Sequence, residues 1–204
     1  MSFHIIPLGM RCQAVEVVSS CVSQPRYTFD WIQMNLDTMC QILSLNKSDI
    51  DNFIRNYLSC VDSTTKMHKL TSSWFPHDDI VDLEGFIQKY IRRSHRLLDT
   101  IHNIGTHKIF VIFFGTYIRK KNHIIAQKLI STVSTICKDQ LYFFIVNCYL
   151  ENKNDTYICD DRTNQILYIH EPLNKRKGEH AWGELTQKVS IRFKKYIDEL
   201  NFQK

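Results

Sequence analysis

The chain has 204 residues, of which 44% are hydrophobic, and this suits one domain with a substantial core. Its formal net charge of +5 is smaller than a dedicated nucleic-acid-binding domain would carry, so we expect no nucleic-acid partner. No apolar run approaches the roughly 20 residues of a membrane-spanning helix, and residues 1–8 lack the regions of a secretory signal, so we expect a cytoplasmic protein with no membrane partner.

The cysteine and glycine patterns argue against two common kinds of site. Seven cysteines are an odd number and include no Cys-x-x-Cys pair, which indicates reduced thiols rather than a zinc ribbon. The six glycines include no Gly-x-Gly, so a nucleotide-binding loop of the usual kind is not expected. The compact acidic group at residues 77–82 lacks a second set of ligands. We therefore expect neither a metal nor another cofactor. The sequence does not indicate the oligomeric state.

In the first half of the chain, an apolar run of strand length at residues 3–8 precedes several segments with helical spacing. Those helical segments are residues 13–20, 36–43, 49–58 and 82–101. The middle two form a helical elaboration near residues 36–60. Gly105 follows the last segment, where a glycine commonly ends a helix.

The second half alternates between strand and helix. The expected elements are a strand at 108–114, a helix at 123–136, a strand at 141–148, a hairpin or strand pair at 157–160 and 165–170, and a helix at 182–200. Two runs that are apolar on both faces, separated by a helix, are typical of a parallel sheet covered on both sides. The pattern predicts one α/β layered domain over residues 1–204, with a mainly parallel central sheet flanked by helices.

Cys12 is the most informative residue of the chain. Gly9 permits a sharp turn after the first strand, and Cys12 then falls at or near the start of the first helix. A thiol there lies beside unpaired backbone N–H groups and the positive end of the helix dipole, both of which stabilise the nucleophilic thiolate. The alternative is that Cys12 is a half-buried structural cysteine.

Four motifs carry a resemblance to a known family: Leu8-Gly9-x-x-Cys12, Phe29-Asp30-Trp31, Phe75-Pro76-His77-Asp78 and an arginine-containing helix at residues 90–96. The chain resembles a family of uncharacterised proteins catalogued, by prediction, as papain-like cysteine peptidases. The resemblance covers the first half well and the second half only as a strand–helix–strand pattern. It departs at Pro7, where the family usually has a small polar residue. The site residues that it implies are Cys12, Asp30, Trp31, His77, Asp78, Arg93 and Arg96.

The resemblance also implies an α+β papain-like fold, in which a helix carrying the cysteine packs against an antiparallel sheet carrying the histidine. That fold is the alternative to the parallel sheet predicted from the periodicity. For the architecture we favour the periodicity, and for the site we favour the motifs.

A cysteine nucleophile needs a base within hydrogen-bond reach and often a third group that orients the base. His77 is the first candidate, because it lies in the family-like motif and follows Pro76 at an expected turn. Asp30 or Asp78 could orient its imidazole. The alternative is that His77 caps a turn and Asp78 caps a helix. His170, at the end of an expected strand, is the second candidate base.

Further residues could bind substrate. Arg93 and Arg96 are three apart on a helix and share a face, so they could bind a carboxylate or phosphate. They could instead pair with Asp30 or Asp78. Trp31 could line a pocket or belong to the core, and Gln13 begins the helix whose N–H groups would stabilise an oxyanion.

Three functions fit these residues. The first is a cysteine-dependent hydrolase or acyltransferase, with Cys12 as nucleophile, His77 as base and a peptide or other acyl compound as substrate. The second is a non-catalytic α/β module that binds an anionic ligand or protein partner through Arg93, Arg96 and a basic face. The third is a sugar- or nucleotide-processing enzyme that uses the carboxylates of Asp30 and Asp78.

Overall fold

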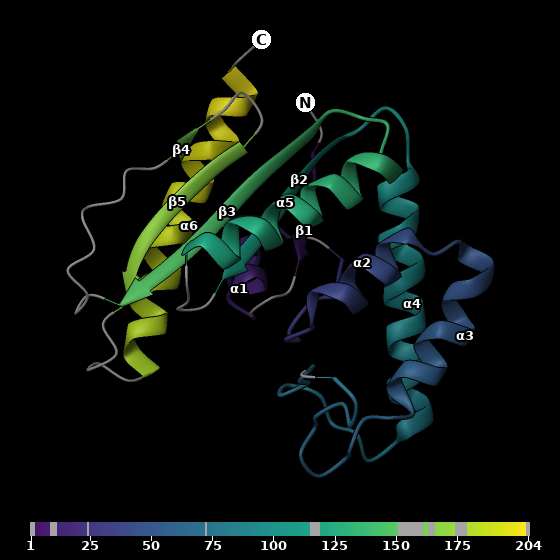
Figure 1. Ribbon diagram of the computed structural model, residues 1–204. Helices are drawn as coiled ribbons and strands as arrows, with labels where there is room; N and C mark the ends of the chain where they lie inside the picture. The colour runs from purple at the N-terminus through teal and green to yellow at the C-terminus, as the bar shows by residue number, and fades with distance from the viewer. Residues whose placement is uncertain are drawn as a thin grey trace.

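The computed structural model describes residues 3–8, 12–23, 25–71, 73–114, 119–150, 161–162, 166–173 and 179–202 (Figure 1). The strands are β1 (Phe3–Leu8), β2 (His107–Phe114), β3 (Leu141–Leu150), β4 (Asp161–Arg162) and β5 (Ile166–Leu173). The helices are α1 (Gln13–Cys21), α2 (Leu36–Ser44), α3 (Lys47–Leu58), α4 (Leu83–His102), α5 (Arg119–Ile136) and α6 (Glu179–Phe202). None of these helices combines the length and the apolar character that a membrane crossing requires.

The strands form one sheet in the order β1-β2-β3-β5-β4. β1, β2, β3 and β5 are parallel, and the short β4 runs antiparallel to β5. The predicted α/β class with a mainly parallel sheet is therefore confirmed, and the antiparallel sheet of the papain-like alternative is not what the described strands form. The strand expected at 157–160 lies outside the described residues.

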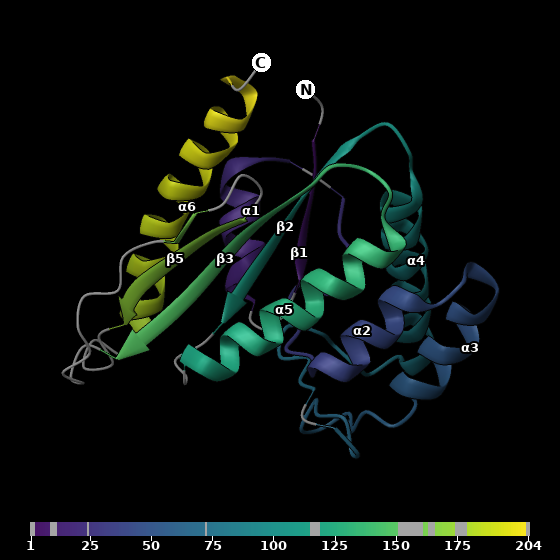
Figure 2. The same ribbon diagram turned by 45° about the horizontal axis from the view of Figure 1, so that its top comes forward.

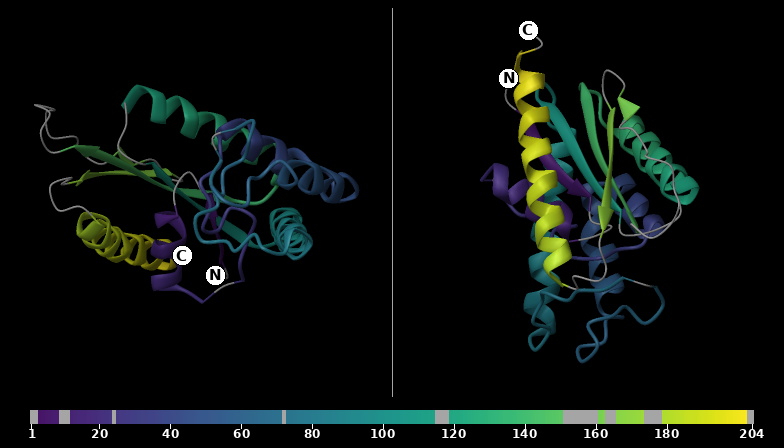
Figure 3. Two further views of the ribbon diagram at one scale, coloured as in Figure 1. Left: turned by 90° about the horizontal axis from the view of Figure 1, so that it is seen from below. Right: turned by 90° about the vertical axis from the view of Figure 1, so that its left-hand side faces the viewer.

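Helices cover both faces of the sheet because β2 and β3 are apolar on both sides. Alternate residues such as Ile109 and Val111 pack with α1 and α6 on one face. Their neighbours, such as Phe110 and Ile112, pack with α5 and with the helices α2 to α4. Figure 3 shows the sheet with α1 and α6 on one side and α5 on the other, and Figure 2 shows α5 running beside β3 in roughly the opposite direction. Nearly continuous apolar strands require this double cover.

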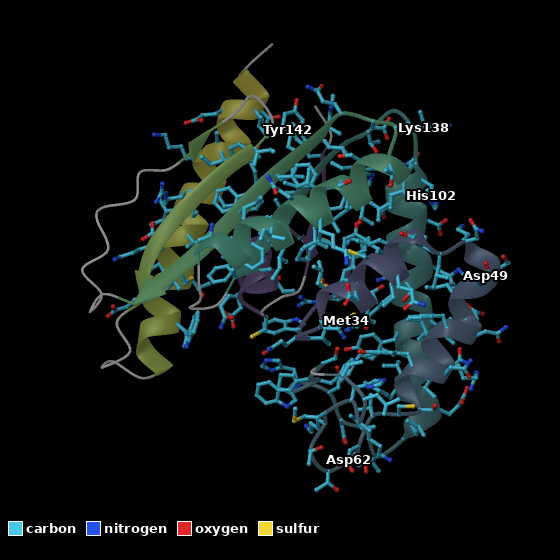
Figure 4. The ribbon with its side chains drawn as sticks, viewed as in Figure 1. Met34, Asp49, Asp62, His102, Lys138 and Tyr142 are labelled. Atoms are coloured by element: carbon cyan, nitrogen blue, oxygen red, sulfur yellow. The ribbon has the colours of Figure 1, made fainter. Side chains whose placement is uncertain are left out.

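A buried lysine fixes the turn between α4 and β2. Lys108 is 0% exposed, and its Nζ donates to the carbonyl oxygens of Asn103 at 2.8 Å and Thr106 at 3.1 Å and pairs with the Asp139 carboxylate. Asp139 also accepts a hydrogen bond from the Gly105 N–H at 2.9 Å. Gly105 has φ of +91°, a conformation that glycine adopts without steric cost. The cation also lies near the negative end of the α4 dipole. Figure 4 labels His102 and Lys138 on the two sides of this turn.

Replacing Lys108 tests this arrangement. Lys108→Ala removes the ammonium and its packed stem, and leaves two carbonyl groups and Asp139 without their donor. We expect the free energy of unfolding to fall by about 3 kcal/mol, measured by urea denaturation. Lys108→Met keeps most of the stem, so it should lose less than Lys108→Ala. Equal stability of Lys108→Ala and the wild type would contradict the anchoring role.

Candidate functional site

Cys12 lies directly before α1, four residues after the carboxyl end of β1. Its carbonyl oxygen accepts hydrogen bonds from the N–H groups of Val15 at 3.0 Å and Glu16 at 3.3 Å, so it begins the first helical turn. The thiol is half-buried, and its Sγ lies 3.7 Å from Oε1 of Gln13. The helix start that was predicted around Cys12 is therefore present in the structure.

The connections that leave β1 and β2 go to opposite faces of the sheet. β1 leads to α1 on the face covered by α6, whereas β2 leads to α5 on the other face. In parallel sheets, ligands bind outside the carboxyl ends of strands, at the point where neighbouring connections diverge in this way. Cys12 occupies that position in this fold.

α6 packs alongside α1. Glu16 accepts a hydrogen bond from Thr186 at 3.2 Å, and Ser20 bonds to Ser190 at 2.8 Å. Each pair is four residues further along both helices, so α1 and α6 run parallel and begin at the same end of the sheet. Counting four residues back from Glu16 and from Thr186 places Cys12 level with Trp182. Two helix N-termini on one side of the sheet favour negative charge there.

A separate cluster forms where two loops meet α4. The first loop carries Asp30 and Trp31, and the second carries His77 and Asp78. The rings of Trp31 and His77 are in edge contact, with centroids 5.0 Å apart and planes at 66°. Figure 4 places Met34, which follows the first loop, far from Tyr142 near the amino end of β3 and nearer the loop that contains Asp62. Met34, just after the first loop of the cluster, therefore lies away from the amino end of β3.

Asp30 closes the turn that presents Trp31. Its N–H donates to the Tyr27 carbonyl at 3.2 Å, and its Oδ2 accepts from the Tyr27 N–H at 3.0 Å. These two bonds lead into Trp31, whose φ of +64° is unusual for a residue other than glycine. The Oδ1 of Asp30 is buried without a hydrogen-bond partner. Burial raises the pKa of Asp30 from 3.8 to about 6, although the Tyr27 N–H and three arginines act in the opposite direction.

Asp78 is engaged by α4. The Tyr90 hydroxyl donates to its Oδ2 at 2.5 Å, and Lys89 pairs with its Oδ1. Burial, together with the Asp78 charge, raises the pKa of Tyr90 well above 10.0. Both Asp78 oxygens are thus occupied by α4 residues. His77 is exposed, and within the described part of the chain neither Asp30 nor Asp78 forms a hydrogen bond with it.

The structure brings most of the predicted site residues together but leaves the catalytic pair unlinked. Asp30, Trp31, His77, Asp78 and the arginines of α4 gather in one cluster. No hydrogen bond joins the described side chains of Cys12 and His77. His170 lies in β5 with its Cα beside Asn147, and its side chain is outside the described residues. The choice of base stays a prediction.

Sequence reasoning missed three participants. Tyr90 was included only in the arginine-containing helix at residues 90–96, Lys89 was assigned no role, and Arg26 lies in a loop without a motif. In β3, the buried Oδ1 of Asn147 has no hydrogen-bond partner. The described residues contain no group of three or more His, Cys, Asp or Glu side chains that could hold a metal ion.

Comparisons with models of protein families, with curated proteins and with solved structures find no match to this chain. A functional assignment therefore depends on the geometry of the chain itself.

The raised pKa of Asp30 predicts a pH-dependent contribution to stability. The folded state holds the Asp30 proton more tightly than the unfolded state, so this contribution is fully present below pH 3.8 and is lost as the pH rises toward about 6. Asp30→Asn should remove this slope, which amounts to about 3 kcal/mol between those limits. Urea denaturation from pH 4 to 7.5 measures it.

Asp62→Asn is the matched control. Hydrogen bonds from Thr65 lower the pKa of Asp62, so its contribution has the opposite sign: it is present at neutral pH and lost in acid. Parallel stability curves for the wild type and Asp30→Asn would show that Asp30 titrates as in the unfolded chain.

Proposed function

We propose that the protein is a cysteine-dependent hydrolase or acyltransferase with Cys12 as its nucleophile. The observation that carries the proposal is the position of Cys12 at the start of α1, where the connections of β1 and β2 diverge. A thiol at a helix N-terminus is favoured as thiolate, and the carboxyl end of a parallel sheet is where substrates bind. The class of acyl substrate, peptide or other, is open.

In the proposed reaction, the Cys12 thiolate attacks the acyl carbon and forms a tetrahedral oxyanion. Because the N–H groups of Val15 and Glu16 bond to the Cys12 carbonyl, those of Gln13 and Ala14 are the remaining first-turn donors for the oxyanion. The base takes the thiol proton and returns it to the leaving group, which departs and leaves an acyl-thioester on Cys12. Water, or an acceptor nucleophile, then attacks the thioester and regenerates the thiol.

His77 is the proposed base. It is exposed and lies at a turn, so its imidazole is accessible to a substrate. Its ring contacts Trp31, which holds one side of the imidazole. Asp30 supports this arrangement indirectly, because its two bonds to Tyr27 shape the turn that leads to Trp31. In this proposal Asp30 is a positioning residue, as is Asp78 through Tyr90.

Alkylation by iodoacetamide tests the nucleophile. At pH 7 we expect Cys12 to react about tenfold faster than Cys60, a half-buried cysteine away from a helix start, because only Cys12 is favoured as thiolate. The rates are read by peptide mass spectrometry. His77→Ala should slow Cys12 and leave Cys60 unchanged. A slow Cys12 that reacts only on unfolding would overturn the proposal.

Acyl transfer tests the reaction itself. With p-nitrophenyl acetate, the wild type should release a burst of nitrophenol and carry one acetyl group on Cys12, seen by mass spectrometry. Cys12→Ala should lose the burst, whereas Cys60→Ser should keep it. His77→Ala and His170→Ala identify the base. The base is the histidine whose replacement abolishes the burst and the pH dependence of the acylation rate. A burst that survives in Cys12→Ala would assign the chemistry to another residue.

A further inference from the structure

Three arginines lie close enough to Asp30 to lower its pKa, and one of them stacks on Trp31. Arg96 of α4 donates from its Nη1 to the Arg26 carbonyl oxygen at 2.6 Å, which joins α4 to the loop before Asp30. The Arg26 guanidinium lies over the Trp31 ring, 5.5 Å from its centroid. The Arg93 guanidinium lies over the Tyr90 ring at 5.3 Å. Stacking on aromatic faces holds two of the three guanidinium planes. One Arg26 nitrogen donates to the Ser19 hydroxyl at 3.4 Å, and the other N–H groups of these two guanidiniums form no hydrogen bond with the described residues.

These arginines are not matched by acids of their own. In the part of the chain that the structure describes, none of the three forms an ion pair within 4.0 Å of a carboxylate oxygen. By contrast, Arg55 and Glu84 on neighbouring helices pair at 2.7 Å. A guanidinium that stays charged and stacked without a carboxylate partner is a recognition group for oxyanions.

Asp30 is a carboxylate that all three arginines affect. Their charges lower its pKa, Arg93 most strongly, but do not offset the effect of burial. Asp30 is 1% exposed, and its Oδ1 has no partner, so it does not form the two-pronged pair that would neutralise an arginine. The group thus carries three positive charges against one negative charge at neutral pH.

We infer that Arg26, Arg93 and Arg96 form a binding site for a phosphate group, with Trp31 as its wall. The net charge of about +2 matches a phosphomonoester, which carries nearly two negative charges at neutral pH. Planar guanidinium edges pair bidentately with its oxygens. Trp31 also contacts His77, so a ligand held here would extend toward the proposed base. Phosphate binding itself does not depend on the proposed function of Cys12.

Isothermal titration with inorganic phosphate at low ionic strength tests the site. We expect saturable binding to the wild type, weakened about tenfold or more in Arg93→Gln and in Arg26→Gln, because each variant loses a charged, bidentate contact. Arg92→Gln is the matched control, because Arg92 is exposed on the same helix and does not contribute to the cluster. Binding that is absent, or equal in all four proteins, would overturn the inference.

Asp30→Asn gives a readout that a purely structural cluster would not show. Removing the one negative charge should tighten phosphate binding several-fold at pH 7.5, and the difference should shrink near pH 5, where Asp30 is already protonated. Unchanged affinity would mean that phosphate binds away from Asp30, and would contradict a site formed by the arginines around it. Titrations with a phosphoserine peptide and with glycerol phosphate then distinguish a phosphorylated polypeptide from a small phosphomonoester as the natural source.

Cys12→Ala separates the two proposals. It should bind phosphate as the wild type does, because Cys12 has no part in the arginine cluster. Phosphate binding with an unreactive Cys12 would leave a binding module without thiol chemistry. A reactive Cys12 without phosphate binding would leave the enzyme and remove the phosphate site.

Discussion

The central strands β2 and β3 must be covered on both faces, and this requirement determines where the chain can place a site. Side chains such as Ile109 and Phe110 are fully buried on opposite faces of the same strand. Burying one such side chain contributes roughly 1.5–3 kcal/mol, so both faces need helices. The chain meets this need by sending β1 to α1 on one side and β2 to α5 on the other. The divergence at Cys12 is a consequence of the double cover.

Periodicity was sufficient to predict this architecture. The apolar runs at 108–114 and 141–148 indicated strands buried on both faces, and the helix between them indicated a parallel pair. It was not sufficient for Lys108, whose burial depends on Asp139 and on carbonyl oxygens of the α4–β2 turn. Local pattern contains no information about such a distant partner. The antiparallel sheet implied by the papain-like resemblance was wrong, because motif residues specify a site more directly than a sheet direction.

In the candidate site too, the local sequence pattern predicted some features, and contacts between distant segments determine the others. The three-residue spacing of Arg93 and Arg96 predicted only that they share a face of α4, and in the structure both lie near the Asp30 loop. The spacing could not show that Tyr90, which is buried, donates a hydrogen bond to Asp78. It also could not show that both carboxylates are occupied by backbone or α4 groups rather than by His77. Contacts between loops far apart in sequence decide these roles, and no single segment encodes them.

The turn at residues 27–30 does not explain why position 30 carries an ionisable carboxylate rather than a neutral side chain. Keeping the carboxylate ionised at neutral pH costs about 3 kcal/mol relative to the unfolded chain, because burial raises its pKa from 3.8 to about 6. This net cost already includes the hydrogen bond from the Tyr27 N–H, and an asparagine oxygen would accept the same bond without the cost. The arginines lower the cost but are not paired with the carboxylate. A buried negative charge behind three cations reduces their mutual repulsion while leaving their outer edges available. On this argument, Asp30 sets how much positive charge the cluster presents to a ligand.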